Sequence, residues 1–521
     1  MLINKNYIVL PVTYRMASKK LKFTENGKLI FDMDVCLDTK SPRALAYYDI
    51  KRFRGKDLEI TVDPEMNYVP VLVDEPDETN LYREKYRPEV HFTAKFGWLN
   101  DPNGLVKVGD TYHMFFQHNP CLWRWGNMHW GHAVSTDLFH WKELDHALFP
   151  DEMGTMYSGS AIIDKDNVTG LGDGKTPPVI FFYTAASENN IISEGKKYTQ
   201  CLAYSLDGGM TLHKYKNNPI IDHIEACNRD PKVVWCEPIG KFLMSLYLNE
   251  NRYALFSSAD LIHWDRFQDL SIENDSECPD MFPIKADDGR NLWCIYGAST
   301  RYLVGEFRDG KFVPIQGVET LRNSDWGYAG QTFSDMPDGR RILVLWECLD
   351  MGTDPICGQM SLPLDLKLKN IDGKYLLTAY PVEELAGLRK EVIRKNVTVS
   401  GKEQVAFRDL GDDACDLTLR FRYQKDKKFF VSLFGAYFTV DMEKNEIWLH
   451  DRHEPISHSA DGDCEIRIVL DRCTAEVFTD GGLYPMALEN IADLNIDTMV
   501  ISGDVSDLSV EFAPLKSVWE G

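Results

Sequence analysis

The sequence predicts an all-β protein in which a five-bladed β-propeller is followed by a C-terminal β-sandwich, with a small N-terminal β accessory module. Three observations favour this fold class: apolar runs recur through the middle of the chain, a second motif recurs in phase with them, and helical patterns are sparse. We therefore assign residues 1–85 to the accessory module, 86–380 to the propeller, 381–395 to a linker helix and 396–521 to the sandwich.

The recurring runs have the length of β-strands and are rich in aromatic and β-branched residues. They follow one another at intervals of about 50–67 residues and cover 112–116, 179–183, 242–247, 292–296 and 342–346. Such a period leaves room for several strands in each unit, which is typical of propeller blades. A long antiparallel sandwich is the alternative, but it predicts shorter intervals between equivalent strands.

The second motif covers residues 135–141 and returns at 258–264 with five of its seven positions identical. A weaker copy lies at 205–209. Because these copies keep step with the apolar runs, they indicate the same turn in successive blades.

The two ends of the chain show the alternation of β-strands. Near the N-terminus, Asn26-Gly27 marks a hairpin turn, after which Leu29, Phe31 and Met33 are expected on one face. After the propeller, Pro381 stands where a helix begins, and the pattern over 381–389 predicts the linker helix. Alternating strands return from about residue 396.

Composition narrows the possible partners. The chain has 57 Lys and Arg against 80 Asp and Glu, a net charge of −23, which disfavours nucleic acid and membrane partners and is compatible with a neutral ligand.

The start of the chain lacks the apolar core and the cleavage site of a signal peptide, so we expect a cytoplasmic protein. The twelve cysteines form no CxxC pair and are expected to be free thiols.

Three acidic residues lie in apolar, turn-forming surroundings, where solvation of a surface charge explains them poorly. Asp101 lies within an Asn-Asp-Pro-Asn-Gly segment, Asp230 stands between Arg229 and a proline, and Glu277 precedes a cysteine and a proline. An adjacent Arg favours an ionised Asp, and apolar surroundings favour the neutral Glu that a general acid requires. Paired carboxyl groups of this kind serve glycoside cleavage as nucleophile and acid/base.

Each segment also has a structural interpretation. Asp101 could form an ordinary Asx-turn, and Arg229-Asp230 a surface ion pair. Asp280, three residues after Glu277, is a rival for the acid/base role.

Together and in this order, the segments resemble glycoside hydrolase family 32, the β-fructosidases (invertases, levanases and inulinases). The resemblance is carried by His91-Phe92-Thr93, the segment 97–104 and the segments around Asp230 and Glu277. It extends to about residue 389 and continues more weakly through the sandwich. Tyr157, where the family has Phe, is a mild departure.

The resemblance implies a retaining hydrolase that releases terminal β-linked fructose from sucrose or fructans. It makes Asp101 the nucleophile, Glu277 the acid/base and Asp230 the residue that stabilises the transition state. It also implies substrate-binding roles for Asn100, Gln117, Trp125, Ser158, Arg229, Tyr328 and Trp346. No metal or organic cofactor is implied, and for His129 and His132 we expect a structural or hydroxyl-binding role rather than a metal site.

Two further functions stay open at this stage. One is fructosyl transfer, in which a sugar replaces water as acceptor, and the other is a catalytically inactive fructan-binding protein. The accessory module resembles a β-domain that precedes some bacterial fructan-active relatives, which favours fructo-oligosaccharides or levan as substrate. Exo or endo action and the oligomeric state are not predicted.

Overall fold

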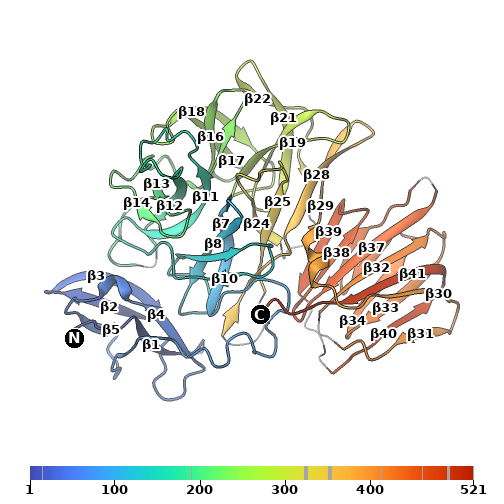
Figure 1. The fold of residues 1–521 in the computed structure, drawn as a ribbon, viewed down its shortest axis with the longest axis horizontal. Coiled ribbons are helices and arrows are strands. Elements are labelled where there is room, and N and C mark those ends of the chain that lie inside the picture. The colour runs from blue at the N-terminus through green and yellow to red at the C-terminus, as the bar shows by residue number, and fades with distance from the viewer. Residues whose placement is uncertain are drawn as a thin grey trace.

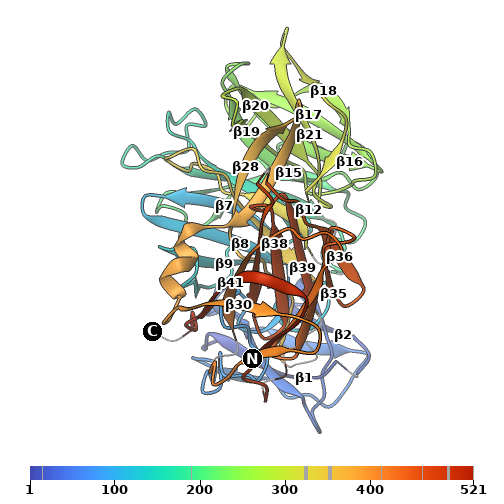
Figure 2. The same ribbon diagram turned by 90° about the vertical axis from the view of Figure 1, so that its right-hand side faces the viewer.

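The computed structural model describes the whole chain except residues 15, 189, 322–326, 350–354, 412–413, 460, 490–492, 494 and 520–521. Within the described residues, the regular structure consists of β-strands and two short 3-10 helices, η1 (Lys51–Phe53) and η2 (Glu383–Leu388). Figures 1 and 2 show a propeller with a sandwich on one side and a small N-terminal module on another. No helix in this part of the chain is both long and apolar enough to span a membrane. The predicted fold class is confirmed.

Five antiparallel sheets form the blades of the propeller. Blade 1 contains β7 (Gly97–Val108), β8 (Thr111–Asn119), β9 (His129–Ser135) and β10 (Lys142–Glu143), with β26 (Ile356–Cys357) added in parallel to β7. Blade 2 contains β11 (Thr155–Ile163), β12 (Val179–Ala186), β13 (Thr199–Ser205) and β14 (His213–Lys214). Blade 3 contains β15 (Arg229–Cys236), β16 (Lys241–Asn249), β17 (Arg252–Ser258) and β18 (Asp265–Ser271).

The last two blades complete the circle. Blade 4 contains β19 (Asp280–Lys285), β20 (Asn291–Tyr296), β21 (Arg301–Arg308) and β22 (Lys311–Pro314), with β23 (Glu319–Thr320) on β21. Blade 5 contains β24 (Gly327–Thr332), β25 (Ile342–Glu347), β28 (Leu364–Ile371) and β29 (Lys374–Pro381), with β27 (Gln359–Met360) on β25. The innermost strands β7, β11, β15, β19 and β24 contact one another in this order, and β24 contacts β7. This closed ring excludes the alternative of a long sandwich.

Both sequence repeats occupy equivalent places in the blades. The apolar runs are the second strands β8, β12, β16, β20 and β25, which are covered by a neighbouring blade on each face. The second motif is the turn after the third strand, where the Ser135 hydroxyl accepts the N–H groups of Asp137 and Leu138 at 3.1 and 3.0 Å. Ser258 accepts the corresponding groups in blade 3.

Blades 1 and 2 pack closely around a glycine. Phe115 of β8 meets Phe181 of β12 edge to face, with ring centroids 5.0 Å apart. Gly104 of β7 has a φ of +53°, and a Cβ at this position would lie 3.0 Å from the Phe115 ring and 3.2 Å from that of Trp130. The left-handed backbone and the rings of its own blade therefore favour glycine at this position, where a Cβ would also lie 3.4 Å from Phe181 of blade 2.

The N-terminal module consists of two three-stranded sheets that enclose one apolar core. One sheet contains β4 (Ala44–Asp49), β1 (Tyr7–Val12) and β6 (Val71–Val73), and the other β3 (Lys28–Val35), β2 (Lys19–Glu25) and β5 (Glu59–Asp63). Asn26 and Gly27 form the predicted hairpin turn, with φ values of 50° and 78°. The expected position of Leu29 is wrong, because a β-bulge between Phe23 and Thr24 shifts the pairing and leaves Phe31 and Met33 in the core.

The C-terminal sandwich packs two six-stranded sheets around an apolar core. The first sheet contains β30 (Ile393–Val399), β41 (Val505–Pro514), β32 (Cys415–Arg422), β37 (Asp463–Leu470), β38 (Thr474–Thr479) and β39 (Tyr484–Glu489). The second contains β31 (Gln404–Phe407), β40 (Met499–Gly503), β33 (Lys428–Leu433), β34 (Ala436–Asp441), β35 (Glu446–Leu449) and β36 (Arg452–Pro455).

The predicted linker helix over 381–395 is wrong in type and extent. Pro381 is the last residue of β29 rather than the first of a helix, and β30 already begins at Ile393. Between them lies the six-residue 3-10 helix η2, which buries Leu385 and Leu388. Residues three apart share a face in a 3-10 helix, so a pattern of this length does not distinguish it from an α-helix.

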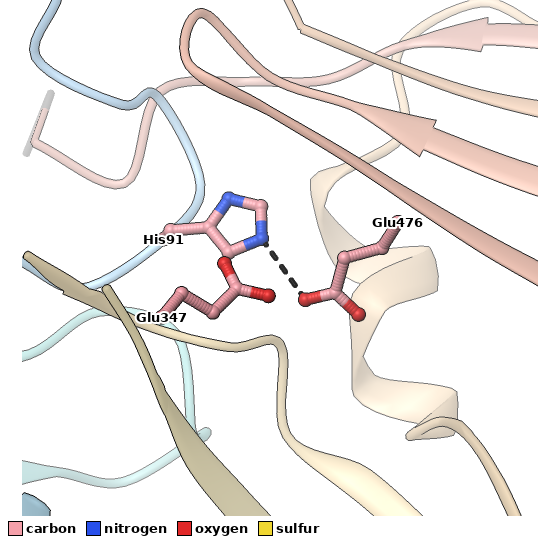
Figure 3. A group of neighbouring side chains, drawn as sticks. All are labelled: His91, Glu347 and Glu476. Atoms are coloured by element: carbon pink, nitrogen blue, oxygen red, sulfur yellow. Dashed lines mark hydrogen bonds and ion pairs between the residues drawn. The ribbon is translucent and has the colours of Figure 1, made fainter. Parts of the chain in front are cut away.

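A buried cluster of charged side chains joins the propeller to the sandwich (Figure 3). His91, just before β7, donates from Nδ1 to Asp471 at 2.8 Å and contacts Glu476 of β38 through Nε2 at 3.3 Å. Glu347 of β25 completes the group, whose side chains are fully buried. Burial by itself lowers the pKa of His91, but Asp471 and Glu476 outweigh it and raise the pKa to about 10. The imidazolium therefore supplies a positive charge between the carboxylates.

We predict that His91→Ala lowers the free energy of unfolding by about 3–5 kcal/mol at pH 6, because it leaves buried carboxylates without their partner. The folded pKa of about 10 lies above the ordinary 6.5, so this stabilisation is complete below about pH 6.5 and is lost as the pH rises toward 10. Urea unfolding at pH 6 and pH 9.5 measures the difference between wild type and variant.

His263→Ala is the matched control, because His263 also pairs with an Asp but its side chain is 86% exposed. Its effect should stay below about 1 kcal/mol at both pH values. An equal pH dependence of stability in wild type and His91→Ala would contradict the prediction.

Candidate active site

The N-terminal ends of the inner strands meet at one end of the propeller. Residues of all five strands, or of the turns that lead into them, line a small cavity there, including Pro102, Gly159, Pro231, Pro279 and Ala329. The three acidic residues come from β7, β15 and the turn before β19, so that segments 176 residues apart share one site.

The strands are irregular where they reach this cavity. Pairing with the second strand is interrupted between Leu99 and Pro102 in β7, and at similar places in β11, β15 and β24. Asp230 and Glu277 have φ values of 66° and 59°. Bulges and left-handed residues re-aim the neighbouring side chains.

Asp101 therefore does not lie in the turn that its segment predicts. It lies within β7, in the bulge between Leu99 and Pro102. Among the described residues, β26 pairs with β7 only at Gly97 and Trp98, so no strand pairs with this edge at Pro102 and its missing N–H costs no ladder hydrogen bond there. Gln117 of β8 stands opposite this bulge, between the paired residues of the two strands.

Three side chains contact the Asp101 carboxyl group. Ser158 of β11 donates to Oδ2 at 2.5 Å, Asn100 donates to Oδ1 at 3.2 Å, and the Cys278 thiol lies 3.5 Å from Oδ2. Trp98 donates to the oxygen of the Asn100 amide at 2.9 Å, which turns the amide nitrogen toward Asp101. Burial raises the pKa of Asp101. The nearby charge of Glu277 raises this pKa further, while hydrogen bonds from Ser158 and Asn100 lower it.

Asp230 is buried and receives the N–H of Cys278 at 3.0 Å. Nε of Arg229 lies 3.6 Å from its carboxylate. Burial is the main cause that raises the pKa of Asp230 to about 7; Arg229 lowers it, while Asp101 and Glu277 add to the rise. Arg229 thus favours the ionised form, as the sequence predicts, but burial outweighs it.

Glu277 has different surroundings from those that its sequence predicts. Its side chain is 32% exposed, and polar groups rather than apolar ones hold it. Arg229 forms an ion pair with Oε1, and the Tyr328 hydroxyl donates to Oε2 at 2.8 Å. The guanidinium of Arg229 also lies over the ring of Tyr247 at 4.8 Å. One arginine therefore contacts two of the three carboxyl groups.

Asp280, the rival of Glu277, is fully buried behind the site. It accepts hydrogen bonds from the Thr332 N–H and hydroxyl groups and lies 3.2 Å from the Lys232 ammonium group. With these partners Asp280 fixes neighbouring inner strands and is not exposed to a ligand.

The remaining predicted residues lie beside residues of the site, in contact with Tyr328, Tyr157 or Met156. Trp346 of β25 packs near Tyr328 and Trp98, with ring centroids 6.4 and 5.5 Å away. Trp125 is 41% exposed in the loop between β8 and β9, and its ring edge meets Tyr157 at 5.9 Å. Gln117 is buried and donates to the carbonyl of Met156 at 2.9 Å.

His129 and His132 do not form a pair. His129 contacts the Tyr48 hydroxyl of the N-terminal module at 2.9 Å, whereas His132 contacts His113 at 3.1 Å. Burial lowers the pKa of both imidazoles. Their observed contacts are structural.

The structure adds contacts that the sequence does not predict, and two residues that it does not single out. Tyr157 donates to Glu188 at 2.5 Å, and Tyr198 donates to the same carboxylate. Burial raises the pKa of the Cys278 thiol, which is therefore neutral between Asp101 and Asp230. Glu188 and Tyr198 lie in a loop without a motif, so only their position in space reveals them.

Comparisons with known proteins show which family the chain resembles. Residues 91–381 match the family model described as the glycosyl hydrolases family 32 N-terminal domain. The levanase of Bacillus subtilis (strain 168) is 31% identical, over 85% of this chain and 72% of the levanase. The extracellular exo-inulinase of Aspergillus awamori is 29% identical, over 84% of this chain and 96% of its own length.

Solved structures agree with the fold. The crystal structure of exo-inulinase from Aspergillus awamori superimposes with a TM-score of 0.75 at 25% identity, covering 84% of this chain and all of the inulinase chain. The chain belongs to glycosyl hydrolase family 32.

Proposed function

We propose that this protein is a retaining glycoside hydrolase that releases terminal β-D-fructose from sucrose, fructo-oligosaccharides or fructans. The observation that carries the proposal is the contrast between Asp101, anchored by Ser158 and Asn100, and Glu277, which is partly exposed. A fixed nucleophile and an accessible acid/base are what retaining cleavage requires. The names of the relatives, levanase, invertase and exo-inulinase, support the substrate class.

In the first step, an oxygen of Asp101 attacks the anomeric carbon of fructose while Glu277 gives its proton to the leaving oxygen. Hydrogen bonds from Ser158 and Asn100 stabilise the carboxylate form that attacks. Asp230 and Arg229 bind the hydroxyl groups at positions 3 and 4, as the family resemblance implies. This step forms the fructosyl–Asp101 ester and frees the leaving group as an alcohol.

In the second step, Glu277 takes a proton from water, whose oxygen attacks the same anomeric carbon. Asp101 leaves as a carboxylate, and fructose is released with its configuration retained. Arg229 and Tyr328 hold Glu277 in place through both steps. Glu277 is partly exposed, so that water can reach the carboxylate that activates it.

The inactive fructan-binding alternative has less support, since all three carboxyl groups are present and held at one site. The cytoplasmic location stays a prediction.

Asp101→Ala and Glu277→Ala should each reduce fructose release from sucrose by at least about 10³-fold, because each removes one half of the acid–base and nucleophile pair. Circular dichroism should show both variants folded. On an activated aryl β-fructoside, whose leaving group needs no protonation, azide should restore turnover in Glu277→Ala because it needs no general base, but it should yield no retained product in Asp101→Ala. Asp269→Ala, at an exposed carboxylate, is the matched control. Undiminished activity in either site variant would overturn the assignment.

At high sucrose concentration, the products should be mainly free fructose and glucose, because water reaches Glu277. Chromatography of the products at early conversion measures the ratio. A mixture dominated by oligosaccharides would instead assign the protein to fructosyl transfer.

We expect Asp230→Asn to stabilise the fold at pH 8 at the expense of activity. The folded pKa of about 7 lies above the ordinary 3.8, so ionisation of Asp230 lowers stability as the pH rises from about 4 through 7. Removing this charge should increase the free energy of unfolding relative to wild type. The increase should be larger at pH 8 than at pH 5 by on the order of 2 kcal/mol. Asp269→Asn should show no such difference, and equal behaviour of the two variants would refute the prediction.

A further inference from the structure

The N-terminal module meets the propeller at two loops that carry the rim of the active site. One is the loop between β8 and β9, which holds Trp125, and the other is the loop between β12 and β13, which holds Glu188 and Tyr198. The module precedes the matched family domain, which begins at residue 91. In Figure 1 the module lies against the part of the propeller that contains β8 and β10.

Asp34 of β3 holds the first loop. Its N–H donates to the Asn127 side-chain oxygen at 2.8 Å, and the Asn127 amide donates back to the Asp34 carbonyl at 2.7 Å. Asn127 is buried, has a φ of 48° and lies two residues after Trp125. The side chain of Asn127 thus pairs with the backbone of the module as a neighbouring strand would.

Asp32, also on β3, holds the second loop. Its carboxylate is 1% exposed and accepts the N–H of Ile191 at 2.8 Å and that of Ile192 at 3.0 Å. The Lys20 ammonium group lies 3.5 Å away. A buried carboxylate is costly unless it is hydrogen-bonded, so these contacts fix the loop against the module.

The two loops meet at Tyr157. The ring of Tyr157 touches Trp125 of the first loop, and its hydroxyl donates to Glu188 of the second. The next residue is Ser158, which donates to Asp101. A continuous set of contacts therefore runs from the module, through both loops, to the nucleophile.

We propose that the N-terminal module is part of the substrate-binding apparatus, with Asp32 as a positioning residue for the rim formed by Trp125, Tyr157 and Glu188. A partly exposed indole ring such as that of Trp125 and a carboxylate are groups that bind a sugar ring and its hydroxyls. The module sets how well this rim is ordered before substrate arrives, and hence the apparent affinity for fructosides. This inference rests on the proposed function.

The test compares Asp32→Asn with wild type on sucrose and on the trisaccharide 1-kestose. Because the amide accepts backbone N–H groups less strongly than a carboxylate, KM should rise at least about fivefold for both substrates while kcat changes by less than about twofold. A purely structural role would instead lower the active fraction, and so kcat, with KM unchanged, and that result would overturn the proposal. Asp32→Glu should recover part of the affinity.

Asp63→Asn is the matched control, since Asp63 lies on β5 of the same sheet and its side chain is 62% exposed in a surface pair with Lys22. It should leave KM and kcat at wild-type values. A rise in KM equal to that of Asp32→Asn would show a general effect of the module and overturn the role of Asp32.

Two measurements do not depend on turnover. Amide hydrogen exchange of Ile191 and Ile192 should be faster in Asp32→Asn, and calorimetric affinity for fructose should fall in parallel with the kinetic change. If wild type releases no fructose, the proposed function fails, and the calorimetric comparison still decides the inference. Unchanged exchange and unchanged fructose affinity would overturn it.

Discussion

The guanidinium group of Arg229 allows three carboxyl groups to share one small site. It contacts Asp230 and Glu277 directly, and it is itself supported by the Tyr247 ring. Burial would lower the pKa of Arg229, but the two acids outweigh burial and raise it, so the charge on each partner stabilises the other. Arg229 is the main group that opposes the rise in the pKa of Asp230 caused by desolvation, whereas hydrogen bonds oppose the corresponding rise at Asp101.

The propeller provides the geometry for this concentration of charge. Within the described residues, the inner strand of each blade has no paired strand on its other edge at the prolines and bulges of the site, and β26 pairs with β7 only at Gly97 and Trp98. Regular pairing further along the same strands and tight packing between blades keep the irregular ends in place. The rigid part of each strand and its reactive end are thus adjacent segments of the same element, a common arrangement at functional sites.

Sequence patterns predict the parts of this molecule that repeat. The second strand of each blade is apolar on both faces, which makes the five runs visible and the fold class predictable. The turn after the third strand is also visible, because its capping serine and aspartate recur. The linker is predicted incorrectly, since a spacing of three between Leu385 and Leu388 suits either helix type.

The site is only partly predictable for a physical reason. The residues can be selected by motif, but their surroundings depend on partners far away in the chain. Arg229 determines the surroundings of Glu277 from 48 residues away, and contacts with Lys232 and Thr332 distinguish Asp280 as structural. The bulge at Asp101 follows from its place on an inner strand, which the local Asp-Pro-Asn-Gly signal cannot convey.

The cluster around His91 has a consequence for the order in which the molecule is completed during synthesis. His91 emerges from the ribosome before the first propeller strand, whereas Asp471, its partner, follows 380 residues later. Glu347 and His91 belong to the propeller, whereas Asp471 and Glu476 belong to the sandwich. A chain interrupted before residue 471 therefore lacks both of the carboxylates that contact His91 from the sandwich.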